Sequence, residues 1–262
     1  MADDALILAL SEIDPPVAYA GEREQWTVRL AGLDLPAGGR VKLQLSGGRG
    51  NDADWEPPQV ENPAGDAYVS ARASNGVTLS LGVTTWDPDR ESAVEITVAG
   101  LGLPPDEVLT VVLGDRSGGG GGIQPQTFSQ RCKPLFVLVD RGNGQWIKAA
   151  NPPVLEVRGG PPDTIRLIVP STLRADEHFD GLIRIEDTYG NLANYYEGHL
   201  QLASEGGRLK LPSPVTLSEA DGCLYQVRDL HLREPADGFR LRVREPNQGK
   251  RAGASLADAQ PK

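Results

Sequence analysis

The residues of this sequence that could carry out chemistry form short acidic, histidine-containing and glycine-rich groups. Asp87 and Asp89 flank Pro88 and follow Trp86. Two carboxyl groups that face each other across a cleft can catalyse glycoside hydrolysis. Positions i and i+2 of a strand share one face, however, and the intervening proline indicates a turn. We therefore expect this carboxylate pair to be structural.

The candidate metal ligands are incomplete as binding patterns. His178, His199 and His231 form no H-x-H, H-x-x-x-H or C-x-x-C arrangement, so we expect His199 and His231 to be ordinary polar residues on strand faces. The acidic segment 52–56 has carboxylates at alternate positions, as calcium ligands can have, but lacks the glycine and terminal glutamate of an EF-hand loop. The sequence predicts no metal and no cofactor.

A run of five glycines, Gly118–Gly122, follows a predicted strand at residues 108–113. A phosphate-binding loop would lead into a helix and usually contains Lys followed by Ser or Thr. Here Ile123 and Gln124 lead to Pro125, so we expect a flexible surface loop. The sequence also contains no G-x-S-x-G nucleophile elbow. These absences predict a protein that is not an enzyme.

Tryptophan positions provide a candidate ligand site. Trp26 and Trp146 lie in apolar alternation and are expected in the core, whereas Trp55 and Trp86 lie in polar loops and are expected at the surface. Exposed aromatic rings in a sandwich can stack on sugars. Trp55, Trp86 and Asp87 therefore form the candidate site of an alternative function, a carbohydrate- or small-ligand-binding module.

The elements that would position these groups are strands. Apolar residues alternate with polar ones at 26–30, 41–45, 77–81, 94–98 and 109–113, which is typical of sheets with one buried face. No window of helical length has a continuous apolar stripe, and Gly (31 residues) and Pro (21 residues) punctuate the chain. The fold class is therefore predicted to be all-β, with antiparallel sandwiches.

Proline and glycine pairs at 151–153 and 159–162 flank one short strand and mark a domain boundary. We expect a first β-sandwich domain at 1–160, with long acidic and glycine-rich loops. A compact immunoglobulin-like sandwich is expected at 161–246. Residues 247–262 contain one large apolar side chain and are expected to form a flexible tail.

Charge and composition restrict the partners and the compartment. The formal net charge of −10 disfavours nucleic acid and anionic membranes as partners. No stretch approaches the ~20 apolar residues of a membrane span, and Leu6–Leu10 is better explained as a first strand than as an export signal. Cys132 and Cys223 lie on opposite sides of the boundary, and two free thiols suit a reducing compartment. We expect a cytoplasmic protein, and the sequence leaves its oligomeric state open.

The strand at 182–187 runs into a predicted turn at Asp187–Asn191. An aspartate can close such a turn through its own backbone, Gly190 allows a positive φ, and Asn191 tolerates the left-handed region. Asp187, Gly190 and Asn191 are therefore the predicted structural turn. This D-x-x-G-N segment resembles the recurring turn of bacterial immunoglobulin-like domains.

Further segments resemble an uncharacterised bacterial family in which β domains precede a larger domain similar to metal-dependent phosphoesterases. The segments are Val111–Gly118, Gln124–Phe128, Phe136–Asp140, Pro214–Gly222 and Glu234–Val243. The larger domain of that family opens with Gly-Asp-Leu-His-Gly, which does not occur here, and Asp229-Leu230-His231 lacks the glycines. The resemblance thus implies a noncatalytic accessory or scaffold region that supports or docks onto a metallohydrolase-type partner.

Overall fold

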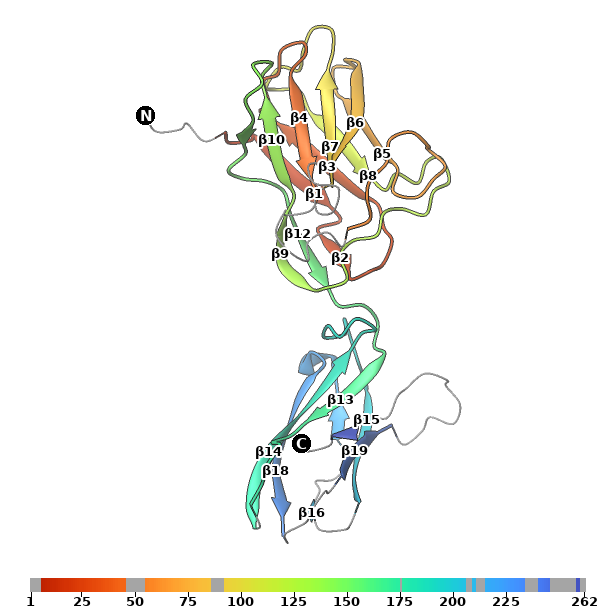
Figure 1. Ribbon diagram of the computed structural model, residues 1–262, viewed down its shortest axis with the longest axis vertical. Coiled ribbons are helices and arrows are strands. Elements are labelled where there is room, and N and C mark those ends of the chain that lie inside the picture. Colours follow the sequence, from red (N-terminus) through yellow and green to blue (C-terminus); the bar gives the residue numbers. More distant parts are fainter. Residues whose placement is uncertain are drawn as a thin grey trace, which may run out of the picture. The chain divides into compact units, whose positions relative to one another are not determined.

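The computed structural model describes residues 6–45, 55–85, 92–174, 176–205, 209–210, 215–233, 240–245 and 258–259. The chain divides into two compact units, Met1–Val157 and Arg158–Lys262. Both are built from antiparallel sheets, as the alternation of apolar residues predicts (Figure 1). The all-β fold class is confirmed.

Unit 1 contains three sheets. The four-stranded sheet has the order β1 (Leu10–Asp14), β3 (Trp26–Ala31), β8 (Leu109–Leu113), β5 (Val69–Ala73). The five-stranded sheet has the order β11 (Ile147–Lys148), β10 (Phe136–Asp140), β4 (Arg40–Gln44), β7 (Ser92–Val98), β6 (Leu79–Thr85). A three-stranded sheet joins β2 (Val17–Tyr19), β12 (Val154–Arg158) and β9 (Gln130–Pro134).

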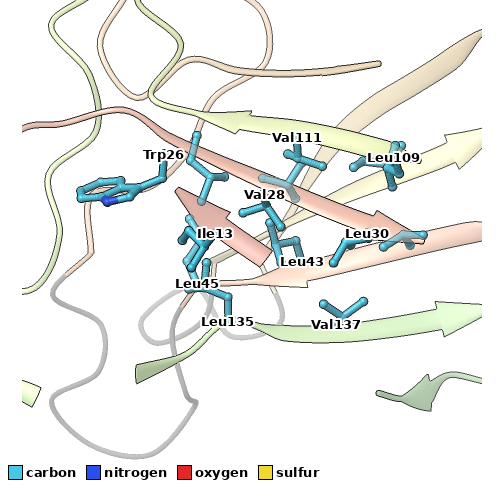
Figure 2. Close-up of a cluster of buried hydrophobic side chains, with 14 of the residues drawn as sticks. Ile13, Trp26, Val28, Leu30, Leu43, Leu45, Leu109, Val111, Leu135 and Val137 are labelled. Atoms are coloured by element: carbon cyan, nitrogen blue, oxygen red, sulfur yellow. The ribbon is translucent and has the colours of Figure 1, made fainter. Parts of the chain in front are cut away.

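The core of unit 1 comes from the inward-facing residues of both larger sheets. Trp26, Val28 and Leu30 of β3 are fully buried, as is Leu43 of β4 in the other sheet. Figure 2 shows these side chains converging in one apolar cluster. Burial at every second residue is what fixes the register, because a one-residue slip would turn each apolar side chain toward water.

Unit 2 contains two four-stranded sheets. The first has the order β13 (Thr164–Ile168), β14 (Glu177–Glu186), β18 (Leu224–Leu232), β16 (Leu209–Lys210). The second has the order β17 (Val215–Leu217), β15 (Gly198–Glu205), β19 (Arg240–Arg244), β20 (Asp258–Ala259). A short 3-10 helix, Glu219–Asp221, precedes β18. Ile183, Leu200, Leu230 and Leu241 lie at the centre of its core.

Three local expectations differ from the structure. The first strand begins at Leu10, and Leu6 instead forms an isolated bridge to Ala149. Asp258–Ala259, within the expected tail, pair with β19, while residues 246–257 and 260–262 lie outside the described part. Trp146 is half-buried rather than in the core, and the Arg40 and Lys42 cations lie over its ring, 4.8 and 4.6 Å from the centroid.

Candidate interaction site

The predicted turn after β14 is organised around the buried carboxylate of Asp187. Its Oδ1 accepts hydrogen bonds from the backbone N–H groups of Tyr189 and Asn191, both at 2.9 Å. Its Oδ2 accepts from the Asn191 side chain at 2.8 Å and from the N–H of Gly160 at 2.9 Å. Gly190 has a φ of +87°. The turn therefore also holds the segment that enters unit 2, a role that its sequence does not reveal.

Two further contacts hold the segment around Gly159 and Gly160 against the turn. The N–H of Asn194 donates to the carbonyl of Gly160 at 2.9 Å. A Cβ atom added at Gly159 would lie 1.9 Å from the carbonyl oxygen of Leu192, so this position admits only glycine. The turn is a structural clamp within unit 2, with its carboxylate occupied by four donors.

The expected ligand-stacking surface is not supported at Trp55. This ring is only 2% exposed and packs against Trp26, with ring centroids 5.5 Å apart. Its Nε1 donates to Oε1 of the buried Gln126 at 3.3 Å. The expectation of an exposed Trp55 is wrong, because a polar loop in sequence folds this ring into the core. Trp86 and Asp87 lie outside the described residues.

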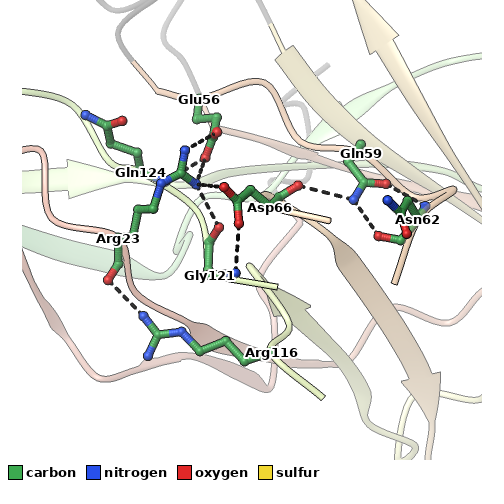
Figure 3. A network of polar contacts seen from close by, with 9 residues as sticks. Arg23, Glu56, Gln59, Asn62, Asp66, Arg116, Gly121 and Gln124 are labelled. Atoms are coloured by element: carbon green, nitrogen blue, oxygen red, sulfur yellow. Dashed lines mark hydrogen bonds and ion pairs between the residues drawn. The ribbon is translucent and has the colours of Figure 1, made fainter. Parts of the chain in front are cut away.

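An ion-pair network holds the loops of unit 1 together (Figure 3). The Arg23 guanidinium donates to both oxygens of Glu56, at 2.5 and 2.6 Å, and lies 3.5 Å from Asp66. Asp66 also accepts from the backbone N–H of Gly121 at 2.8 Å. The bidentate contact raises the pKa of Arg23. Glu56 is therefore paired with Arg23. Asp52 and Asp54 of the expected acidic segment lie outside the described part.

The glycine run Gly118–Gly122 packs against the neighbouring loop. A Cβ atom at Gly118 would lie 2.1 Å from the carbonyl oxygen of Pro63, and one at Gly120 would lie 2.3 Å from that of Gly65. Two backbone segments approach here more closely than any side chain allows. Close approach thus accounts for glycine at these two positions, while Gly119 has a φ of +100° and an added Cβ atom there would meet nothing within 4 Å among the described residues.

A second polar cluster lies on the outer face of the first sheet of unit 2. His178 of β14 and His231 of β18 are direct cross-strand partners, and their rings stack with centroids 4.1 Å apart. His178 Nδ1 lies 2.5 Å from Asp229, and His231 Nε2 lies 2.8 Å from Asp176. Histidines that are isolated in sequence therefore become neighbours through strand pairing.

A register shift in β14 and β18 shapes this cluster. The pairing of β14 with β18 is irregular between Phe179 and Gly181, and Asp229 adopts a φ of +59° there. Asp180 accepts from the Asp229 N–H at 3.1 Å and from the Gln226 side chain at 2.9 Å. The irregularity re-aims side chains, as β-bulges commonly do near functional sites.

An open hollow of about 630 Å³ lies beside the cluster on the same sheet. Its lining includes Ile168 of β13, Leu182 of β14 and Leu224 of β18, with Asp180 and Gln226 at its polar side. Ile168 and Leu224 are 46% and 42% exposed. Three adjacent strands therefore present apolar side chains to solvent beside charged and imidazole groups.

The two histidines of the cluster are held by separate carboxylates. Within the described residues, no group of three or more His, Cys, Asp or Glu side chains is placed to hold a metal ion. The stacked imidazoles each bind their own aspartate and do not converge on a common point. Cys132 is exposed in unit 1, and Cys223 is buried in unit 2, where burial raises its thiol pKa. In the part of the chain that is described, no helix has the length and apolar character needed to cross a membrane.

No protein-family model matches the sequence. An uncharacterised protein of Chlamydia pneumoniae is 27% identical over 237 residues, which is 85% of this chain and 36% of that protein. Uncharacterised proteins of Chlamydia muridarum and Chlamydia trachomatis are each 26% identical over 88% of this chain and 38% of their own length. The chain is homologous to these chlamydial proteins and spans just over a third of the length of the curated relatives that it matches.

Proposed function

We propose that the chain is a noncatalytic accessory module whose immunoglobulin-like second unit docks a protein partner. The observation that carries this proposal is the outer face of β13, β14 and β18. Ile168 and Leu224 are half-exposed there on either side of Leu182, beside an open hollow. Exposed apolar side chains that gather beside a hollow and are rimmed by polar groups mark interaction sites.

The proposed partner is a metallohydrolase-type domain. The chlamydial relatives carry more than half of their length outside the part that matches this chain. The family resemblance of the sequence implies a domain similar to metal-dependent phosphoesterases after such β segments. Docking would remove the apolar face of unit 2 from water. The His178 and Asp229 side chains at the rim of this face would form hydrogen bonds with the partner.

Binding measurements test the docking face. The 262-residue chain and the part of a chlamydial relative that lies outside the matched segment are titrated by calorimetry. Leu224→Asp should weaken binding at least about tenfold, because it places a charge within a desolvated contact. Leu101→Asp is the matched control, since Leu101 lies in unit 1 and is 99% exposed. Equal affinities of the two variants, or no binding by the unsubstituted chain, would contradict the proposal.

A hydrolysis assay tests separately whether the chain is noncatalytic. The purified chain is incubated with a generic phosphodiester and Mn²⁺ or Zn²⁺, and product release is followed. We expect no hydrolysis above that of the metal alone. Metal-dependent turnover that copurifies with the chain would contradict the proposal of a noncatalytic accessory module.

A further inference from the structure

Strand β6 differs from the other sheet edges in its chemistry. It lies at one end of the five-stranded sheet and pairs there with β7 alone among the described strands (Figure 1). The segment from Val77 to Thr85 contains no charged residue and no proline. Edge strands normally carry such residues, which prevent pairing with another chain.

The remaining edge strands of the described sheets follow that rule or are too short to need it. Those of five residues are β1, β5, β9 and β13, and each contains at least one charged side chain. The others have two or three residues. The seven residues of β6 thus form the longest edge and the only long one without a charge in the described part of the chain.

The backbone of β6 presents alternate residues to the open side. The Ala99 N–H donates to the Thr78 carbonyl at 3.0 Å, which makes these opposed residues a hydrogen-bonded pair. Because such pairs alternate along an antiparallel ladder, even-numbered residues of β6 bond to β7. The N–H and C=O groups of Leu79, Leu81 and Val83 then point away from the sheet, as do those of Thr85.

Gly82 is an independent indication that something approaches this edge. It lies in the middle of β6, has no positive φ, and an added Cβ atom would meet nothing within 4 Å. The described part of unit 1 therefore does not require glycine at this position. Glycine weakens a strand interior, and it often marks a place where another backbone comes close.

We propose that β6 pairs antiparallel with β6 of a second copy of this chain, about a two-fold axis at Gly82. The pairs would be Leu79 with Thr85, Ser80 with Thr84, Leu81 with Val83, and Gly82 with its copy. In this register the outward-facing residues pair only with one another, so every outward N–H and C=O gains a partner. No like charges meet, and Ser80 lies opposite Thr84, a favourable cross-strand pair.

The two-fold symmetry explains why the occupant is a second copy. A self-complementary edge closes into a dimer and leaves no further edge of β6 exposed. Val83 is 37% exposed in the single chain and would be covered on pairing. The dimer joins two five-stranded sheets of unit 1 and does not depend on the function proposed for unit 2.

Sedimentation equilibrium of the 262-residue chain over a dilution series tests the pairing. Two double variants change the same two positions of the edge. Ser80→Lys with Thr84→Lys places like charges opposite each other twice in the dimer, whereas Ser80→Lys with Thr84→Glu places opposite charges there. The first should raise the dimer dissociation constant at least about tenfold above that of the second. Ser80 is exposed and Thr84 is half-buried, so both variants should fold.

The outcomes separate the alternatives. A dimeric parent chain that becomes monomeric in the Lys/Lys variant and stays dimeric in the Lys/Glu variant supports the proposal. A monomeric parent chain at all concentrations overturns it. So does a dimer that the Lys/Lys variant leaves intact, or a Lys/Glu variant that is as weak as Lys/Lys while circular dichroism shows both folded.

Discussion

The two units of the chain differ in the side chains that form their cores. All four tryptophans of the sequence lie in unit 1, and the rings of Trp26 and Trp55 pack against each other in its core at an interplanar angle of 55°. Among the described residues, the core of unit 2 has Phe179 and Tyr196 as its buried aromatic side chains, each 8% exposed, together with smaller aliphatic side chains. Unit 1 thus buries a pair of tryptophans, Trp26 and Trp55, while unit 2 has Ile168 and Leu224 half-exposed on one outer sheet face beside an open hollow.

The two units also differ in where their ion pairs lie. In unit 1, the Arg23 and Arg40 guanidinium groups bind carboxylates that hold loops and strand ends. In unit 2, His178 and His231 bind exposed aspartates on the outer face of a sheet. Polar contacts therefore brace both units, at Arg40 in unit 1 and at the Asp187 turn in unit 2, and unit 2 has a further exposed set where a partner is proposed to bind.

The largest effects are expected from truncating one buried core side chain in each unit, because each substitution should destabilise its own unit. Leu43→Ala in unit 1 and Leu230→Ala in unit 2 each remove a fully buried side chain. Each should lower the free energy of unfolding of its own unit by about 2–5 kcal/mol through lost burial and a cavity. Tryptophan fluorescence during urea unfolding follows unit 1 alone, and hydrogen exchange of peptides from 158–262 follows unit 2.

Leu101→Ala is the control for both variants, because Leu101 is almost fully exposed and should leave both transitions unchanged. If Leu230→Ala shifted the fluorescence transition as much as Leu43→Ala does, the units would unfold as one and the comparison would fail.

A smaller effect is expected at the turn of unit 2. Asp187→Ala removes the acceptor of the Gly160 N–H and of both donors of Asn191. Hydrogen bonds to a charged acceptor contribute about 1.5–3 kcal/mol, and we expect a loss in that range. Hydrogen exchange should then accelerate at 158–162 and at the turn.

Asp187→Asn is the matched comparison, since it keeps the shape and one acceptor oxygen. It should be less damaging than Asp187→Ala. Equal protection of 158–162 in the parent and in Asp187→Ala would show that the carboxylate does not hold this segment.

Opposite responses to pH should sharpen the contrast between the units. Hydrogen bonds from Arg40 and from the glycine turn lower the pKa of Asp140 below its ordinary 3.8. The folded unit 1 therefore binds this proton less tightly than the unfolded chain does. The stability from Asp140 is present above pH 3.8 and is lost as the pH falls through the lowered value. Asp140→Asn should flatten this acid dependence in fluorescence-detected unfolding.

In unit 2 the responding group is Tyr196. Burial, together with its hydrogen bond to Glu245, raises the pKa of this phenol above its ordinary 10.0. The stability from Tyr196 is therefore present below pH 10.0 and is lost as the pH rises toward the raised value. Hydrogen exchange of unit 2 at alkaline pH should show this loss, and Tyr196→Phe should abolish it. An unchanged dependence in Tyr196→Phe would exclude this phenol as the cause.

Local sequence patterns anticipate much of this structure. Alternation at 26–30, 41–45 and 109–113 predicts β3, β4 and β8 to within a residue or two, because one buried face imposes a period of two. Local chemistry also points to the Asp187 turn, since the aspartate, glycine and asparagine lie within five residues. Asp140 accepts hydrogen bonds from the N–H groups of Gly142 and Gly144 in a similar way, and the D-x-G-x-G spacing of these residues is a local signal of that turn.

Long-range partners set the features that sequence patterns miss. Trp55 lies among acidic and proline residues, and its burial depends on Gln126, 71 positions away. His178 and His231 meet only because strand pairing brings β14 beside β18. A local pattern contains no record of such registers, so the stacked pair and its hollow could not be predicted.

The smallest expected effect concerns the stability contribution of the histidine cluster. The side chains of His178 and Asp229 are 58% and 73% exposed, and solvent-exposed pairs contribute about 0–1 kcal/mol. His178→Ala should therefore change the unfolding of unit 2 by less than about 1 kcal/mol, unlike Leu230→Ala. In the partner titration, the same variant should weaken binding, because the stacked rings border the apolar face. A large loss of stability without a change in binding would place this cluster with the structural braces of unit 1 and remove the distinction between the two units.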